Sequence, residues 1–334
     1  MRQLAARLMA LAPLLGPLFA PPPVRAEPLP GLEAAVRQQL NEVFSTTALL
    51  TNTEALSLGF VNFDPNEFLP IDNPEFGDAE SVQLRNDLEV YTLPWSWVLA
   101  DFEAGQLGLK ARLSYVHSKQ ELSLFPLEDP TVDINDDRIY SLFLQPTFRV
   151  PLGERWRAQF GLGAFVMRYE NDFRFRNSVS RQLQPFLDNN LTNIAVNAWL
   201  VQPELRVDYR FGRGRSYWQY HSALAYTVGR SFNEPGPIVN ADPESWRWLN
   251  GVSMRRPFPL FLPDQDYRLT LNRIDIRGDT VRPFDTHYYY EFSAEWLLNT
   301  KGKVPLLDDV GVGLLLNYGS ALKGASLIFV YNVD

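Results

Sequence analysis

The sequence contains no cysteine and only three histidines among its 334 residues. Without thiols the chain cannot form a disulfide scaffold, a thiolate zinc site or a cysteine nucleophile. Three histidines are too few for a multi-histidine metal site unless all of them converge. An excess of basic residues is also missing, because the formal net charge is −8. General affinity for nucleic acid is therefore not expected.

The first 26 residues have the features of a secretory signal peptide. Arg2 and Arg7 precede an apolar stretch at residues 8–20, and residues 24–26 form a small-residue cleavage site. The stretch is shorter than the roughly 20 residues that a spanning helix requires, so a membrane anchor is the weaker interpretation. Removing 3 of the 31 basic residues leaves 28 against 39 acidic ones, a net charge of −11. A secreted chain without cysteine fits the bacterial envelope.

After the signal peptide the sequence has no apolar run long enough for a transmembrane helix. Apolar residues alternate with polar ones instead, which is typical of strands with one apolar face. Trp156, Phe160 and Leu162, for example, alternate with Gln159 and with glycines. The apolar faces are predicted to contact lipid, and the polar or glycine faces to line a lumen.

Twelve segments are predicted to be strands. Eight are clear, at residues 106–117, 140–150, 156–166, 201–210, 218–228, 288–298, 310–318 and 327–333; four are weaker, at residues 55–63, 81–93, 246–254 and 267–277. A soluble antiparallel sandwich would also alternate. Segments of about 10 to 14 residues, however, match the length that a tilted strand needs to cross a bilayer. The sequence therefore predicts an all-β fold, a transmembrane antiparallel β-barrel of about 12 strands with a short N-terminal helix.

Long and short connections alternate along these strands, as an outer-membrane barrel requires. Long linkers are predicted at residues 64–80, 118–138, 170–191 and 230–245, and short turns at residues 151–154 and 211–215. The later strands follow the rule less well, since residues 255–266 are long for a turn and residues 319–323 short for an external loop. Aromatic residues near strand ends predict an interfacial girdle: Trp95, Trp97, Trp156, Trp218, Trp246, Trp248, Tyr288 and Trp296.

The last predicted strand begins at Gly324 and places Leu327, Phe329 and Tyr331 on one face, as the C-terminal signal strands of outer-membrane proteins do. With the segment Leu58–Pro65, the strand count and a helix before the first strand, it resembles the solitary outer-membrane autotransporter-like β-barrel family. The resemblance implies a bacterial outer-membrane location and recognition of this strand by the barrel-assembly machinery.

Two features depart from that family. The chain ends on Asp334, whereas such barrels usually end on an aromatic residue. Only residues 27–30 separate the predicted cleavage site from the first helix, which leaves no passenger domain. Self-secretion is therefore not inherited from the resemblance.

Residues 31–43 are the one clear helical stretch. Leu32, Val36, Leu40 and Val43 form a narrow apolar stripe on an otherwise polar helix. We expect this helix to lie in the lumen and to pair with inward-facing charges, with a periplasmic helix at the barrel rim as the alternative. The predicted domains are a signal peptide at residues 1–26, an N-terminal segment with the helix at residues 27–50 and an outer-membrane barrel at residues 51–334.

No catalytic, cofactor or metal site is predicted. His117 adjoins Ser118 and His221 adjoins Ser222, so each pair points to opposite faces of a strand and cannot form a hydrolase dyad within it. A dyad assembled across strands stays open. Residues 128–137 contain five carboxylates but lack the glycine and distal glutamate of an EF-hand, which predicts a solvated external loop.

The leading functional hypothesis is a non-enzymatic, porin-like outer-membrane barrel, either a small pore plugged by the helix or a structural surface barrel. The alternative is a membrane-embedded enzyme that acts on lipid A or phospholipid. The predicted partners are outer-membrane lipid and the barrel-assembly machinery, with no nucleic acid and no cofactor.

Overall fold

The computed structural model describes residues 30–52, 56–63, 88–122, 129–233, 240–258, 264–304, 307–319 and 324–331. The predicted signal peptide lies outside these residues. The described elements, in chain order, are α2 (Pro30–Leu50), β1 (Leu56–Phe63), β2 (Leu88–Phe102), β3 (Gly105–Leu122), β4 (Asp133–Pro151), β5 (Trp156–Arg174), α6 (Ser178–Leu187), β6 (Ala195–Arg213), β7 (Ser216–Phe232), β8 (Glu244–Pro257), β9 (Gln265–Gly278), α7 (Val281–Phe284), β10 (Tyr288–Val304), β11 (Leu307–Tyr318) and β12 (Gly324–Tyr331). None of the described helices is long and apolar enough to cross a membrane.

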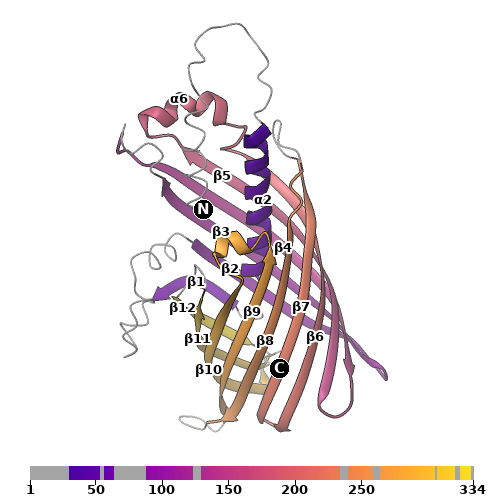
Figure 1. Cartoon of the computed structure of the whole chain (residues 1–334). Coiled ribbons are helices and arrows are strands. Elements are labelled where there is room, and N and C mark those ends of the chain that lie inside the picture. The colour runs from indigo at the N-terminus through magenta and orange to yellow at the C-terminus, as the bar shows by residue number, and fades with distance from the viewer. Residues whose placement is uncertain are drawn as a thin grey trace.

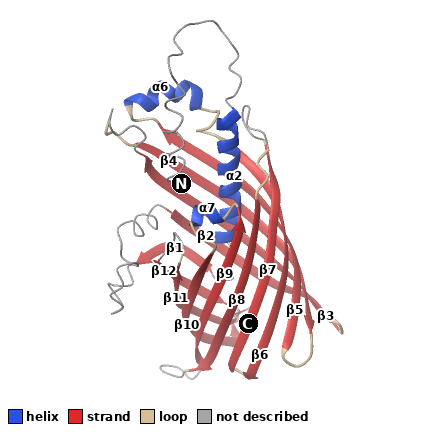
Figure 2. Ribbon diagram, viewed as in Figure 1, coloured by secondary structure: helices blue, strands red, loops and turns tan. Residues whose placement is uncertain are grey.

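The strands form one closed antiparallel barrel in which each strand pairs with its neighbours in the chain (Figure 1). Closure is made by β1, which pairs with β12 at Leu56↔Phe329 and with β2 at Ser57↔Thr92. The predicted twelve-stranded barrel is therefore confirmed. Helices α2, α6 and α7 lie toward the end of the barrel where the longer connections are (Figure 2). We call this the external end, because outer-membrane barrels have short periplasmic turns and long external loops.

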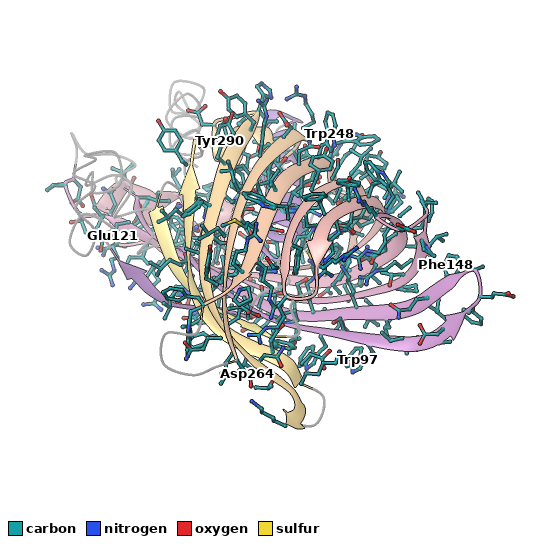
Figure 3. The ribbon with its side chains drawn as sticks, turned by 90° about the horizontal axis from the view of Figure 1, so that it is seen from below. Trp97, Glu121, Phe148, Trp248, Asp264 and Tyr290 are labelled. Atoms are coloured by element: carbon teal, nitrogen blue, oxygen red, sulfur yellow. The ribbon has the colours of Figure 1, made fainter. Side chains whose placement is uncertain are left out.

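The two faces of the strands follow the predicted alternation. On β5, Leu162 is 57% exposed, whereas Gln159 is 3% exposed and faces the interior. Trp97, Phe148, Trp248 and Tyr290 point away from the barrel, as Figure 3 shows from below. On the strands, the large exposed apolar side chains thus form the outer wall, which is the face that a membrane-spanning barrel presents to lipid.

Several predicted boundaries were wrong. The second strand was expected at residues 81–93, but β2 begins at Leu88 and continues to Phe102. It runs through Pro94, which pairs in register with Arg112. Proline lacks only a hydrogen-bond donor, so a strand tolerates it where that donor is not needed.

The connection expected at residues 118–138 is shorter than predicted. β3 continues to Leu122 and β4 begins at Asp133, so polar residues at both ends belong to strands. The connection after β5 contains α6, which was not predicted. Asn177 caps this helix by accepting hydrogen bonds from the backbone N–H groups of Val179 and Ser180.

Candidate functional site: the lumen and its helix

Helix α2 lies inside the external half of the barrel. Val36, Leu40, Phe44 and Ala48 are buried and form a stripe at intervals of four residues. This stripe packs into an apolar cluster that we call the helix pocket. Its inward-facing members on β3 to β6 include Val116, Ile139, Phe143, Phe165, Met167, Tyr169, Val196, Ala198 and Leu200.

The opposite side of α2 contacts the connection between β9 and β10. Gln38 Nε2 donates to Asp279 Oδ1 at 3.4 Å, and Arg282 Nε lies 3.0 Å from Glu42 Oε1. The apolar pair Leu49 and Leu50 continues this contact against the cluster of Ile274, Ile276 and Phe284. Contacts to opposite walls place α2 within the lumen, as predicted.

The helix is longer than its predicted range of residues 31–43. It continues through Phe44 and a polar run to Leu50. Its C-terminal end reaches the middle of the barrel, where the Arg112 guanidinium donates to the Asn52 side chain and stacks on the Phe143 ring. β-branched residues lower helix propensity, but burial of Phe44 and Ala48 in the pocket outweighs that preference.

The inner face was predicted to be polar or glycine, which is correct only for the periplasmic half. In the external half, Phe143, Phe165 and Met167 face inward on the strands whose other residues alternate as expected. Their ring and thioether surfaces are covered by α2 rather than by water. In the sequence alone, an apolar residue on the inner face only interrupts the alternation that predicts a strand. Its packing against a helix from another part of the chain cannot be recognised there.

Below the helix the lumen is lined by paired charges. Arg247 Nη2 lies 3.1 Å from Glu204 Oε2, and both side chains are largely buried. Two further pairs line the same wall, Arg206 with Asp208 along β6 at 3.1 Å and Arg268 with Glu295 between β9 and β10 at 2.6 Å. A small cavity lies between these charges and the end of α2, lined by Ala48, Leu49, Asn52, Gln202, Thr227, Ser245, Trp246, Arg247 and Thr280.

A polar row crosses four neighbouring strands at this depth. His221, Gly251, Asn272 and Glu291 are consecutive register partners on β7 to β10. His221 Nε2 lies 2.8 Å from Asn272 Oδ1, and Asn272 Nδ2 lies 3.5 Å from Glu291 Oε1. A Cβ at position 251 would stand 2.0 Å from the Asn272 oxygen, so only glycine lets these side chains meet across β8.

The periplasmic end of the lumen holds a group that we call the charge cluster, in which Arg255, Asp266 and Asp309 are buried and Arg215 is partly exposed. Asp266 accepts from both arginines at 2.8 Å, and Arg255 also reaches Asp309 at 2.9 Å. These bonds link the turn after β6 with β8, β9 and β11. The cluster therefore ties together strands that are not neighbours.

The acidic segment at residues 128–137 is not the solvated loop that the sequence predicted. Asp133, Asp136 and Asp137 lie in β4 and are buried. Asp133 Oδ1 accepts from the backbone N–H of Asn177 at 2.9 Å and from Ser180 Oγ at 2.8 Å, so it anchors α6. These carboxylates are buried because each has donors from neighbouring strands or from α6, which a single segment cannot reveal.

Two carboxyl groups next to helices at the external end have shifted pKa values. Burial raises the pKa of Asp279, although the Glu244 N–H and the Gln38 amide both donate to it. Hydrogen bonds with Thr131 and Ser178 lower the pKa of Asp129, which lies beside the start of α6. Through Gln38, α2 contacts the Asp279 carboxyl directly.

The histidines lie apart from one another. His117 is on the outer wall between Glu89 and Asp136, at 3.4 and 3.3 Å. His221 belongs to the lumen row, while Ser222 bonds Asn250 on the outer face, so this adjacent pair points to opposite faces as predicted. Among the described residues, no three metal-ligating side chains stand close enough to hold an ion.

Comparisons with known proteins agree with this architecture. The model of the solitary outer membrane autotransporter beta-barrel domain matches residues 41–333. No curated protein sequence matches the chain. The translocator domain of the autotransporter NalP from Neisseria meningitidis is similar in structure, with a TM-score of 0.50, 11% identity, and coverage of 73% of this chain and 80% of that one.

Two other solved structures resemble the chain less. The transport unit of the autotransporter AIDA-I from Escherichia coli has a TM-score of 0.48 and 8% identity, over 74% of this chain and 83% of its own. LpxR from Salmonella typhimurium has a TM-score of 0.43 and 9% identity, and the match covers 82% of this chain and 96% of that one. The structural likeness to NalP supports the fold alone, whereas the family model covers most of the sequence. The chain belongs to the solitary outer membrane autotransporter β-barrel domain family.

Proposed function

We propose that this protein is a non-enzymatic barrel whose lumen is plugged by α2, so that only small solutes pass. Its family implies the bacterial outer membrane. The observation that carries the proposal is the fit between the buried stripe of α2 and the helix pocket. Phe44 is completely buried there although it lies on an N-terminal segment that is no part of the barrel wall.

The depth of this packing favours a resident plug over a helix resting on the rim. Val36, Leu40, Phe44 and Ala48 are each buried, so the apolar contact extends over three helical turns. A buried Leu or Phe side chain contributes about 1.5 to 3 kcal/mol relative to an exposed one. Several such side chains on one stripe hold the helix in place without a covalent link.

The charged lining of the lower lumen indicates which solutes could pass when the plug is displaced. Glu204, Arg247, Arg268 and Glu295 carry both signs and pair with each other. Such a lining is compatible with water and small polar solutes and unfavourable for apolar ones. We infer weak charge selectivity rather than a strong preference for cations or anions.

Conductance in planar bilayers tests the plug. Deleting residues 31–50 behind an intact signal sequence should leave a folded barrel whose single-channel conductance rises severalfold over the parent. Folding is checked by the heat-dependent shift on electrophoresis that is typical of such barrels. Unchanged conductance in a folded deletion variant would contradict the plug.

Because the sequence contains no cysteine, introduced thiols permit a more specific test of the plug. Gln38→Cys and Asp279→Cys place thiols on α2 and on the wall, at side chains now 3.4 Å apart. A short bifunctional thiol reagent should then abolish any spontaneous opening of the double variant. The same reagent should leave each single variant unaffected, which controls for blockage by the reagent itself.

A membrane-embedded hydrolase would behave differently. It would release fatty acid from lipid A or phospholipid in detergent, and His221→Ala or His117→Ala would abolish that turnover. We expect no turnover in the parent. We further propose that the signal peptide at residues 1–26 directs export and that the assembly machinery recognises β12, where Phe329 pairs with Leu56 to close the barrel.

A further inference from the structure

An ordered row of charged side chains lies on the outer wall just beyond the external aromatic girdle. Tyr91, Tyr115 and Tyr140 are neighbours on β2, β3 and β4, with ring centroids 5.9 and 5.2 Å apart. In register with Tyr140, β5 places Arg168 rather than a fourth aromatic ring. Tyrosines in such a belt mark the level where the hydrocarbon of a membrane ends.

The next outward-facing row carries charged side chains on three of the four strands and a histidine on the other. Glu89, His117, Arg138 and Glu170 are consecutive register partners, two residues beyond the tyrosines. Two residues of a strand span roughly 7 Å. The headgroup region of a leaflet has about that thickness, so this row and Arg168 lie at the height of lipid headgroups.

Carboxylates hold the two arginines in a particular way. Asp136 Oδ1 lies 3.0 Å from Arg138 Nε, and Glu170 Oε1 lies 2.6 Å from Arg168 Nε. Each carboxylate thus contacts the Nε edge of a guanidinium, and among the described residues these ion pairs do not engage the Nη groups of either arginine. The two side chains are 37% and 52% exposed.

We propose that Arg138 and Arg168 form a binding site for the phosphate of an outer-leaflet lipid headgroup. They project from adjacent strands as diagonal neighbours, which are about 7 to 8 Å apart between backbones and within reach of one anion. A guanidinium binds phosphate through paired N–H groups, and the Nη groups provide that geometry. Tyr140, half-exposed between them, lies where the sugar or glycerol of the headgroup meets its acyl chains.

The proposal rests on the outer-membrane location and not on the plug. Ion pairs exposed to water contribute little, with a typical value of about 0 to 1 kcal/mol. At a membrane interface the same pairs serve to orient the arginines toward an anion. Because the site is on the outer wall, its failure would leave the conductance experiments unaffected, and a failed plug would leave this site unaffected.

Binding of bis-phosphorylated lipid A to the purified full-length protein in nanodiscs tests the site. The Arg138→Gln/Arg168→Gln variant should bind it at least about tenfold more weakly, because a hydrogen bond to a charged group contributes about 1.5 to 3 kcal/mol. The control variant, Arg176→Gln/Arg181→Gln, makes the same charge change at exposed residues around α6 and should bind as the parent does. Both variants must first show the heat-dependent shift of a folded barrel.

Two further arms identify the ligand. Dephosphorylated lipid A should bind the parent as weakly as phosphorylated lipid A binds the double variant. Inorganic phosphate should compete only at concentrations far above that of the lipid. Equal binding by parent and double variant, equal binding of dephosphorylated lipid, or displacement by phosphate at the lipid's own concentration would each overturn the assignment.

Discussion

The two halves of the lumen are held together by different forces. The external half is apolar, because Phe143, Phe165 and Met167 pack around α2. The periplasmic half is polar, because the charge cluster and the pairs above it link the strands through buried ionic bonds. Backbone ladders join the strands in both halves. Burial of apolar side chains retains the helix in the external half, and buried ion pairs add side-chain links between strands in the periplasmic half.

This division separates plug stability from barrel stability. Expectation from the sequence favoured charge pairing between the helix and the wall, yet Glu33 bonds Arg37 within the helix. In the connection between β9 and β10, Glu42 of α2 pairs with Arg282, and Gln38 donates to Asp279. Changes in the helix pocket should therefore release α2, whereas changes in the charge cluster should weaken the barrel itself.

The largest effect is expected at the centre of the charge cluster. Asp266→Asn leaves Arg215 and Arg255 without their shared, completely buried carboxylate. Removing one partner of a buried pair costs about 3 to 5 kcal/mol of unfolding free energy. Asp308→Asn, which breaks an exposed pair with Lys301, is the matched control and should cost about 0 to 1 kcal/mol. Denaturant titration of the refolded barrel measures both, and similar costs would mean that the cluster does not hold the strands.

A comparable loss in the helix pocket should leave the barrel intact. Phe44→Ala removes a completely buried ring and should weaken α2 docking by about 3 to 5 kcal/mol. Hydrogen exchange should then show reduced protection in α2 with unchanged protection in β4 and β5. Phe186→Ala on α6 makes the same chemical change at a side chain that is 70% exposed. It should change neither the protection of α2 nor that of β4 and β5. Loss of protection throughout the barrel would contradict the division into two halves.

Substitutions on the outer wall test which side of a strand faces lipid, independently of the lumen. Leu162→Arg puts a charge against lipid in the middle of β5 and should destabilise the barrel by about 2 to 4 kcal/mol. Leu152 is equally exposed, at 57%, but lies in the periplasmic turn before Trp156. Leu152→Arg should therefore cost about 0 to 1 kcal/mol. Equal costs in denaturant titrations would mean that Leu162 does not face hydrocarbon.

The smallest effect concerns pH. Burial raises the pKa of Asp279 although the hydrogen bond from Gln38 lowers it, so the buried position beside α2 as a whole favours the protonated carboxyl. Docking of α2 should be strongest below the ordinary carboxyl pKa of about 4 and should weaken as the pH rises through the raised pKa. The open probability should therefore rise with pH over that range, as single-channel recording at a series of pH values would measure. Asp279→Asn should remove this dependence, whereas Asp242→Asn, in an exposed pair with Arg230, should keep it.

Most of the fold could be predicted because alternation is a local property. A strand with lipid on one side shows its period within a few residues, and Leu162 and Gln159 were assigned to the correct faces from sequence. The predicted strand ends were wrong where a strand continues beyond the expected membrane-spanning segment. Asp136 and Asp137 look like a loop when read alone, because Asp137 is buried by donors on β5, Tyr169 and Asn171, and Asp136 lies against His117 on β3.

The lumen was harder to predict because its pattern depends on a second element. The stripe from Val36 to Leu40 predicted a helix with one buried side, but its continuation to Phe44 and Ala48 depends on inward-facing apolar residues of other strands. The row from His221 to Glu291 requires the register of four strands. Gly251 gave a local signal, since a glycine within a strand often marks a close approach.

The strand that closes the barrel is also the one with the least regular pairing. β3 and β4 pair without interruption from Gln106↔Arg149 to Leu122↔Asp133, whereas the register of β1 on β12 shifts between Ser57 and Asn62. Local opening follows the weakest ladder, and amide exchange should begin at this seam long before it reaches β4. The barrel would then unzip from one side as a curved sheet, and the last part to lose its structure would be the long wall against which α2 rests.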